Sequence, residues 1–227
     1  MATNADNASL DLNAQVDAAH GRILVWDIPT RIFHWSLVGC FLIAYLTSES
    51  ERWQLWHVTA GYTFGVLLLF RLVWGVVGTR YARFGNFVQG PKQTMRYLGS
   101  LLTRHPQHYV GHNPAGAWAI IGMIGLGLLA VLTGWASFSD YGDWFGELHE
   151  GIVNVLILVI AIHIGGVIVS SFLHRENLVR SMLNGHKLGN LLDAIRYPQW
   201  IVGALLIVGV GLFLWALLSS RLPVLLP

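Results

Sequence analysis

Four histidines inside apolar segments are the residues of this chain best suited to chemistry. His34 and His57 lie in the first and second apolar segments, and His149 opens the fourth, with His163 placed 14 residues further along it. At about 100° and about 1.5 Å per residue, a helix brings two such positions within about 40° of the same face and about 21 Å apart along its axis. One helix therefore presents two potential ligands on one face, at two depths.

Depth pairs these histidines across segments. His57 begins the second segment at the level of His149, whereas His34 lies at the deeper level of His163. We therefore predict the pairs His57–His149 and His34–His163, each holding one haem iron from both sides through neutral imidazole nitrogen. The separation of the levels argues against zinc, whose four ligands gather at one point. The alternative is that these are interfacial or hydrogen-bonded histidines with no ligand role.

Arg71 is the one basic residue deep inside a predicted span. It follows His57 by 14 residues, so it shares that helical face at the inner level. A buried arginine needs an anionic partner, and no Asp or Glu lies within any predicted span. Haem propionates would supply one with a bidentate fit. The alternative is that Arg71 reaches the headgroups; Arg31 is a second propionate candidate, unless it only marks orientation.

A polar motif, Gly111-His112-Asn113-Pro114, precedes the third apolar segment. It predicts a helix start, with Asn113 as the N-cap and Pro114 in the first helical position. Its polar side chains also face the level of the inner haem. We therefore expect that a quinone head can form hydrogen bonds there, a role compatible with capping.

Composition places these residues in a membrane protein. The chain has 227 residues, of which 54% are hydrophobic and 11% charged, against about 25% charged in soluble domains. Helices are expected because lipid offers backbone groups no partner. The net charge of +2 gives no reason to expect nucleic acid, and there is no CxxCH motif for covalent haem. Five segments are long enough to cross about 30 Å of hydrocarbon: about residues 32–47, 56–77, 115–138, 152–173 and 201–218.

Basic residues give the orientation. Eleven of the lysines and arginines fall before the first span or in the loops after the second and fourth, whereas only Arg52 and Arg221 fall on the other side. This predicts a cytoplasmic N-terminus and a periplasmic C-terminus in a bacterial inner membrane. Residues 91–104 predict an amphipathic helix on the membrane surface. The predicted organisation is a disordered cytoplasmic tail (1–20, not a signal peptide), a cytochrome b domain (21–190) and an additional transmembrane helix (191–227).

The sequence resembles the bacterial cytochrome b561 family and the related b-type subunits of NiFe hydrogenases. The matching pieces are RIFHW, HVTAGY, RLVWG, GHNPAGA, LHE, and HIGG through SSFLHRENLVRSM, in this order within about residues 22–187. The resemblance implies an all-α membrane fold with a four-helix transmembrane bundle holding two haems. It also implies a quinone near the cytoplasmic haem, close to His163, Asn113 and Gly116. The fifth span departs from this pattern, and His112 and His174 leave room for a different inner ligand.

Three functions compete on this evidence. The first is a two-haem carrier that passes electrons between the quinone pool and a hydrogenase, a dehydrogenase or a periplasmic c-type cytochrome. Such a carrier could be a homo-oligomer. Iron held by two histidines has no open position, which suits electron transfer. The second is a self-sufficient superoxide:quinone oxidoreductase. The third is a haem-free transporter or assembly factor that uses its histidines for metal or protons.

Overall fold

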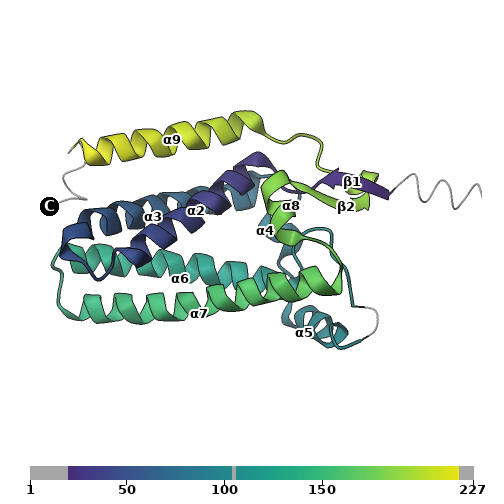
Figure 1. Ribbon diagram of the computed structural model, residues 1–227, viewed down its shortest axis with the longest axis horizontal. Coiled ribbons are helices and arrows are strands. Elements are labelled where there is room, and N and C mark those ends of the chain that lie inside the picture. Colours follow the sequence, from purple (N-terminus) through teal and green to yellow (C-terminus); the bar gives the residue numbers. More distant parts are fainter. Residues whose placement is uncertain (1–19, 104–105, 220–227) are drawn as a thin grey trace, which may run out of the picture.

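Figure 1 shows the computed structural model of the chain, which describes residues 20–103 and 106–219. Within these residues, five helices are long and apolar enough to cross a membrane. They are α2 (Ile28–Leu46), α3 (Gln54–Val77), α6 (Pro114–Phe138), α7 (Trp144–Leu173) and α9 (Trp200–Leu218). Residues 1–19 of the predicted tail lie outside the described residues, as do Arg104 and Arg221.

The five predicted spans are confirmed, and with them the all-α membrane fold. The largest difference is in α7, which begins at Trp144 rather than near residue 152. Its first turns hold Glu147 and Glu150, which hydropathy assigns to a loop. Acidic residues are favourable near a helix N-terminus because of the helix dipole. His149 therefore lies inside the helix, in its second turn.

The long helices form two antiparallel hairpins, α2–α3 and α6–α7, and α3 packs against α6 (Figure 1). Helix α9 lies along α2 and α3. Helix α7 packs chiefly on α6 and buries only Leu156 and Ser170. It is the least covered of the five helices, although it carries two of the four histidines. The main core contains the buried residues Phe33, Phe64, Leu67, Leu68, Ile124 and Leu206.

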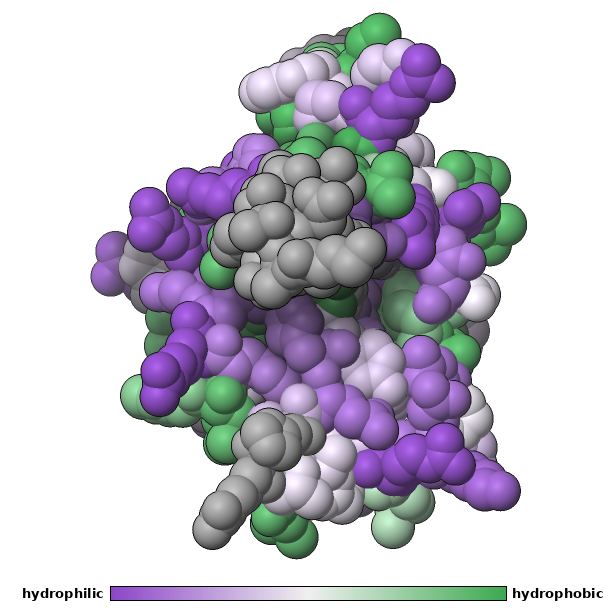
Figure 2. Space-filling model, turned by 90° about the vertical axis from the view of Figure 1, so that its right-hand side faces the viewer, coloured by the Kyte–Doolittle hydropathy of each residue, from purple (hydrophilic) through white to green (hydrophobic). Residues whose placement is uncertain are grey.

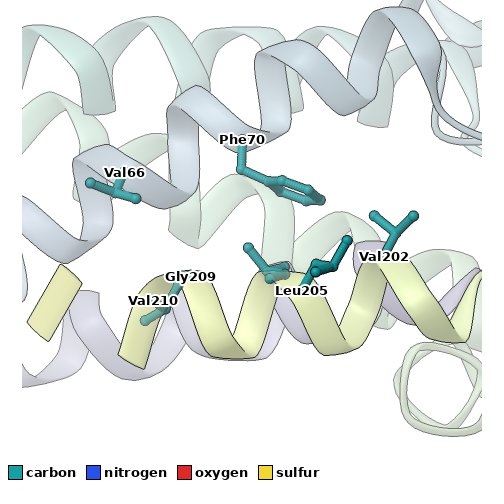
Figure 3. Close-up of a pocket in the computed structure, with 7 residues that line it drawn as sticks. Val66, Phe70, Val202, Leu205, Gly209 and Val210 are labelled. Atoms are coloured by element: carbon teal, nitrogen blue, oxygen red, sulfur yellow. The ribbon is translucent and has the colours of Figure 1, made fainter. Parts of the chain in front are cut away.

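The fifth helix is held closely at its start and more loosely further along. A Cβ atom on Gly203 would lie 2.5 Å from Cγ2 of Ile28, so glycine permits the close approach of α9 to α2. Between α9 and α3 lies an apolar groove of about 330 Å³. Figure 3 shows Val66 and Phe70 of α3 across from α9. The remaining lining residues are Val202, Leu205, Leu206, Gly209 and Val210.

Short elements gather at one end of the bundle, which we call the basic end because most of the arginines and lysines outside the long helices lie there. Figure 2 looks onto this end and shows hydrophilic side chains over much of it. Strands β1 and β2 pair antiparallel there, with Ile23 opposite Lys187. The elements are β1 (His20–Leu24), α4 (Phe84–Phe87), α5 (Pro91–Ser100), α8 (Leu178–Asn184), β2 (His186–Asn190) and the 3-10 helix η2 (Leu191–Asp193). The opposite end holds the 3-10 helix η1 (Glu51–Trp53).

The expected amphipathic helix is present as α5 and ends at Ser100. Tyr97 is buried on one side of it, and its hydroxyl lies 3.5 Å from Oγ of Ser170 in α7. Met95 and Leu98 are exposed on the other side. The helix is therefore fastened to the bundle by one aromatic residue and presents an apolar face outward.

Asp27 joins the start of α2 to the end of α3. Its side chain is 1% exposed and caps α2 by accepting a hydrogen bond of 2.7 Å from the backbone N–H of Thr30. It also accepts hydrogen bonds from Nε1 of Trp74, at 3.1 Å, and from Oγ1 of Thr79, at 2.5 Å. One buried carboxylate thus links the start of α2 to the end of α3 by hydrogen bonds at the basic end.

Replacing Asp27 with alanine should lower the free energy of unfolding by at least about 2 kcal/mol. The change removes a helix cap worth about 1 kcal/mol and leaves buried donors unpaired at about 1–3 kcal/mol each. Thermal unfolding in detergent measures the loss. The control is Asp193→Ala, whose exposed ion pair with Arg80 should contribute less than about 1 kcal/mol. Equal losses in the two variants would contradict the role given to Asp27.

Candidate functional site

Helices α3 and α7 bring His57 and His149 together near the opposite end; we call them the outer pair. Their ring centroids lie 6.1 Å apart, with the ring planes at 81°. Two metal–imidazole bonds of about 2 Å, plus about 1.2 Å from each nitrogen to its ring centre, add to about 6.4 Å. The spacing therefore fits one metal ion between the rings.

Backbone carbonyls set the orientation of both rings in the outer pair. Nδ1 of His57 lies 2.8 Å from the carbonyl oxygen of Ala44 in α2, and Nδ1 of His149 lies 2.9 Å from that of Ala130 in α6. A carbonyl only accepts, so each Nδ1 carries the hydrogen. Each Nε2 is then left with a free lone pair, which is the arrangement found in metal-binding histidines.

Gly134 makes room for the ring of His149. A Cβ atom at this position would lie 2.9 Å from Cε1 and 3.0 Å from Nδ1 of the ring. Nothing lies within 4 Å of a Cβ on Gly61, one turn after His57, whereas one on Gly65 would meet Val131 of α6. Gly61 therefore lies beside open space, and Gly65 serves helix packing.

The inner pair, His34 of α2 and His163 of α7, lies toward the basic end. The two rings are close enough for a charge on one to act on the other. Nδ1 of His34 is buried and has no hydrogen-bond partner. Among the described residues, His163 makes no hydrogen bond either. The inner pair thus lacks the carbonyl contacts that orient the outer pair, and its role stays a prediction.

Arg71 is enclosed by protein between helix α3 and the rings of α4. Its side chain is 3% exposed, and its guanidinium carbon lies 4.5 Å above the ring of Phe84 and 5.8 Å above that of Phe87. Its Nη1 is buried without a hydrogen-bond partner. The charge of Asp27 acts on Arg71, but the two form no ion pair within 4 Å in the described part of the chain. Arg71 therefore keeps unused donor capacity inside the protein.

His112 lies between two aromatic rings, one of which is the Phe87 ring below Arg71. Its ring centroid is 4.6 Å from that of Trp26 and 4.5 Å from that of Phe87. The pKa of His112 is lowered to about 3, mainly by burial and also by charge at Arg71, His163, Lys187 and His34. His112 is thus a neutral imidazole at physiological pH, and its buried Nδ1 has no hydrogen-bond partner.

The predicted cap at Asn113 is confirmed. Its Oδ1 accepts a hydrogen bond of 2.7 Å from the backbone N–H of Gly116, and Pro114 begins α6. Arg31 donates to the carbonyl of Leu183 and has a buried, unpartnered Nε. The predicted roles of these residues toward quinone and propionate stay predictions.

His174 lies apart from the inner pair, in a cluster that sequence reasoning missed. Its ring is 5.1 Å from that of His108. Oε2 of Glu176 lies 3.1 Å from Nζ of Lys187 and 3.5 Å from Nε2 of His108. Burial opposes ionisation of Glu176, but the hydrogen bonds and charges of His108 and Lys187 outweigh it and lower its pKa. Burial lowers the pKa of Lys187 despite this partner.

The described residues contain no group of three or more histidine, cysteine, aspartate or glutamate side chains placed to hold a bare metal ion. The four histidines within the long helices belong to the two predicted pairs, and His112 is buried outside them. In the sequence, these pairs are predicted by the depth of each histidine in its span and by the 14-residue spacing of His149 and His163.

Comparison with known proteins gives one family. A family model described as prokaryotic cytochrome b561 matches residues 25–185. The chain is 28% identical over 146 residues to the probable Ni/Fe-hydrogenase 1 B-type cytochrome subunit of Escherichia coli K12, which covers 53% of this chain and 62% of that protein. It thus spans less than two thirds of that relative. No solved structure matches.

Other relatives are covered over more of their length. The probable Ni/Fe-hydrogenase B-type cytochrome subunit of Rhizobium leguminosarum bv. viciae is 27% identical over 213 residues, covering 73% of this chain and 89% of that protein. The protein of the same name from Bradyrhizobium diazoefficiens is 23% identical over 230 residues, covering 80% and 93%.

Gly134→Ala should displace the ring of His149 and lower the haem content of the purified protein, because a packed interior does not absorb an extra methyl group at this distance. The matched control is Gly125→Ala in the same helix, where nothing lies within 4 Å of the new Cβ. Haem per chain is measured by the pyridine haemochrome spectrum. Equal haem content in the two variants would contradict the role given to Gly134.

The Glu176 carboxylate should stabilise the fold in a defined pH range. Its pKa is lowered in the folded chain, so its contribution is present above the unfolded value of about 4.3 and is lost as the pH falls through the lower folded value. The difference in melting temperature between the wild type and Glu176→Gln should therefore be full at pH 7 and shrink below about pH 4.3. A difference that stays constant down to pH 3 would show that the carboxylate charge is not responsible.

Proposed function

This chain belongs to the prokaryotic cytochrome b561 family, and we propose on that premise that it is a two-haem electron carrier between the quinone pool and a hydrogenase. The family and the five apolar helices make it a multi-pass protein of the bacterial inner membrane. The number of haems, the quinone and the partner belong to the proposal.

The outer pair is the observation that carries the proposal. Its two imidazoles come from different helices, are spaced for one iron and have Nδ1 committed to backbone carbonyls. Fixing the hydrogen on Nδ1 orients a ring and raises its basicity as a ligand through Nε2. A histidine that only filled space at the membrane interface would not require this arrangement twice at one level.

Unpaired polar atoms support a second haem at the inner pair. Burying donors without partners is costly, and three of them lie around this pair: Nδ1 of His34, Nη1 of Arg71 and Nε of Arg31. His34 and His163 would hold the iron, and Arg71 and Arg31 would bind the propionates. The sparse burial of α7 is consistent with a prosthetic group that covers part of it.

The function follows from the chemistry of such a group. A haem with two histidine ligands supplies a one-electron iron couple and has no free coordination position, which favours electron transfer over oxygen binding. The protein's part is to fix the ligand rings, enclose the propionates and keep water away. These residues fit a b-type cytochrome better than a haem-free transporter.

The partner and the quinone are inferred from two sources. The relatives are named as B-type cytochrome subunits of Ni/Fe-hydrogenases, which favours a hydrogenase over a dehydrogenase or a c-type cytochrome. At the inner site, Oδ1 of Asn113 is used by the helix cap, so its Nδ2 is the group left to donate to a quinone carbonyl. His112 and Gly116 lie in the same segment, beside His163.

Orientation and domain organisation complete the proposal. The basic end would be cytoplasmic, because most lysines and arginines outside the long helices lie there. Strand β1 pairs with β2, so the two ends of the segment 20–190 lie side by side. This pairing supports a cytochrome b domain that ends near residue 190. Helix α9 would then be an addition along α2 and α3.

The purified wild type should contain two low-spin haems b per chain. His149→Ala and His163→Ala should each remove about one, and the double variant should be nearly free of haem, because both ligands lie on α7. Haemochrome spectra and mass spectrometry give the stoichiometry. His174→Ala serves as the control, since its ring lies beside His108, and it should retain both haems. One haem in intact wild type would exclude the two-site proposal.

A further inference from the structure

A buried ion pair at the basic end lies outside the two histidine pairs. The side chains of Lys187 and Glu176 are 3% and 12% exposed, with 3.1 Å between Nζ and Oε2. Removing two charges from water is costly, and such a pair is often no more stabilising than an apolar pair of the same size. Stability alone therefore does not explain why this ion pair is buried. Buried titratable groups near binding sites often take part in the function of the protein.

The pair is connected to water on one side. Nε2 of His108 lies 3.5 Å from Oε2 of Glu176, and the side chain of His108 is 43% exposed. The titratable groups that face Glu176 are His108 from the loop before α6, His174 from the end of α7 and Lys187 from β2. Oε1 of Glu176 accepts a hydrogen bond from the backbone N–H of Leu188 at 3.4 Å.

On its other side, the pair reaches the inner site. Nζ of Lys187 donates to the carbonyl of Tyr109 at 3.3 Å, three residues before His112. The charge of Lys187 acts on His112, on which His34 and His163 act as well. Polar contacts therefore run from the surface through His108, Glu176 and Lys187 to the backbone of the loop that carries His112.

We propose that His108, Glu176 and Lys187 form the path along which protons pass between water at the basic end and the quinone at the inner site. This rests on the proposed function. Reduction of a quinone takes up two electrons and two protons and forms an O–H bond at each carbonyl oxygen; oxidation of the quinol reverses this. The electron carrier supplies or removes the electrons one at a time. Protons need a polar path, because charge is costly in the apolar bundle.

Each passage of a proton leaves the path as it began. Lys187 releases a proton toward the quinone, and the neutral amine takes one back from water through His108 and Glu176. Two such passages, together with two electrons from the electron carrier, would convert one quinone to the quinol. The Glu176 carboxylate takes up the incoming proton and passes it to the neutral amine of Lys187, which lies 3.1 Å away. Burial lowers the pKa of Lys187, so it releases a proton more readily than an exposed lysine.

Glu176→Gln in the holoprotein tests the path. Glutamine keeps the size and the acceptor for Leu188 but cannot pass a proton. With a short-chain quinol or quinone, kcat should fall about 100-fold while KM stays the same. Exchange of electrons between the haems and ferricyanide, which needs no proton, should keep its wild-type rate. The midpoint potentials of both haems and the affinity for a quinone-site inhibitor should also be unchanged.

Two further variants separate proton transfer from a structural effect. Glu176→Gln leaves Lys187 as an unpaired buried charge, so the double variant Glu176→Gln/Lys187→Met removes both charges. It should stay as slow with quinone as the single variant; recovery of the rate would show that only the unpaired charge mattered and would overturn the proposal. Asp193→Asn breaks the Arg80 pair, which also measures 3.1 Å but is exposed, and should react like the wild type.

Failure of the inference is distinct from failure of the proposed function. If the wild type reacts with quinone and Glu176→Gln matches it in kcat, the proton path is excluded while the electron carrier stands. If the wild type holds two haems and reacts with ferricyanide but not with quinone, the quinone function is excluded, and the path with it.

Discussion

Lipid provides neither hydrogen-bond partners nor counter-charge, and this constraint governs where each polar group of the bundle lies. Any polar side chain placed within the helices must be satisfied by the protein itself or by something that the protein binds. Asp27 shows the first solution, since Thr30, Trp74 and Thr79 together satisfy its carboxylate. His57 and His149 combine the two solutions, because backbone carbonyls of the protein satisfy Nδ1 of each ring and leave Nε2 for a bound ligand.

The five spans and the approach of His57 to His149 could be predicted from the sequence, because length, hydropathy and position along a helix are local properties. Length and hydropathy define a span, and the 14-residue interval between His149 and His163 defines two levels on one helix. The cap at Asn113 was equally readable, since it joins residues three positions apart. The start of α7 was placed too late, because Glu147 and Glu150 look like loop residues to hydropathy and yet suit the first turns of a helix.

Contacts between distant segments could not be predicted in this way. Strand β1 pairs with residues more than 160 positions away, and neither strand has a distinctive alternation over its five residues. Asp27 lies just before the predicted first span, so the spans themselves contain no anion for Arg71, although the charge of Asp27 acts on that arginine. Glu176, Lys187 and His108 come from three separate segments and meet only in the folded chain.

The two histidine pairs differ in how completely the protein prepares them. The outer pair has its hydrogens fixed by α2 and α6, so its rings are oriented before any ligand arrives. The inner pair lacks such contacts and is surrounded by polar atoms without partners, on His34, Arg71, Arg31 and His112. A site that leaves donors unpaired in a membrane depends on its ligands for stability as well as for function. The inner site is therefore the place where a prosthetic group with carboxylates and an exchangeable carbonyl substrate would both find partners, whereas the outer site offers ligands for iron alone.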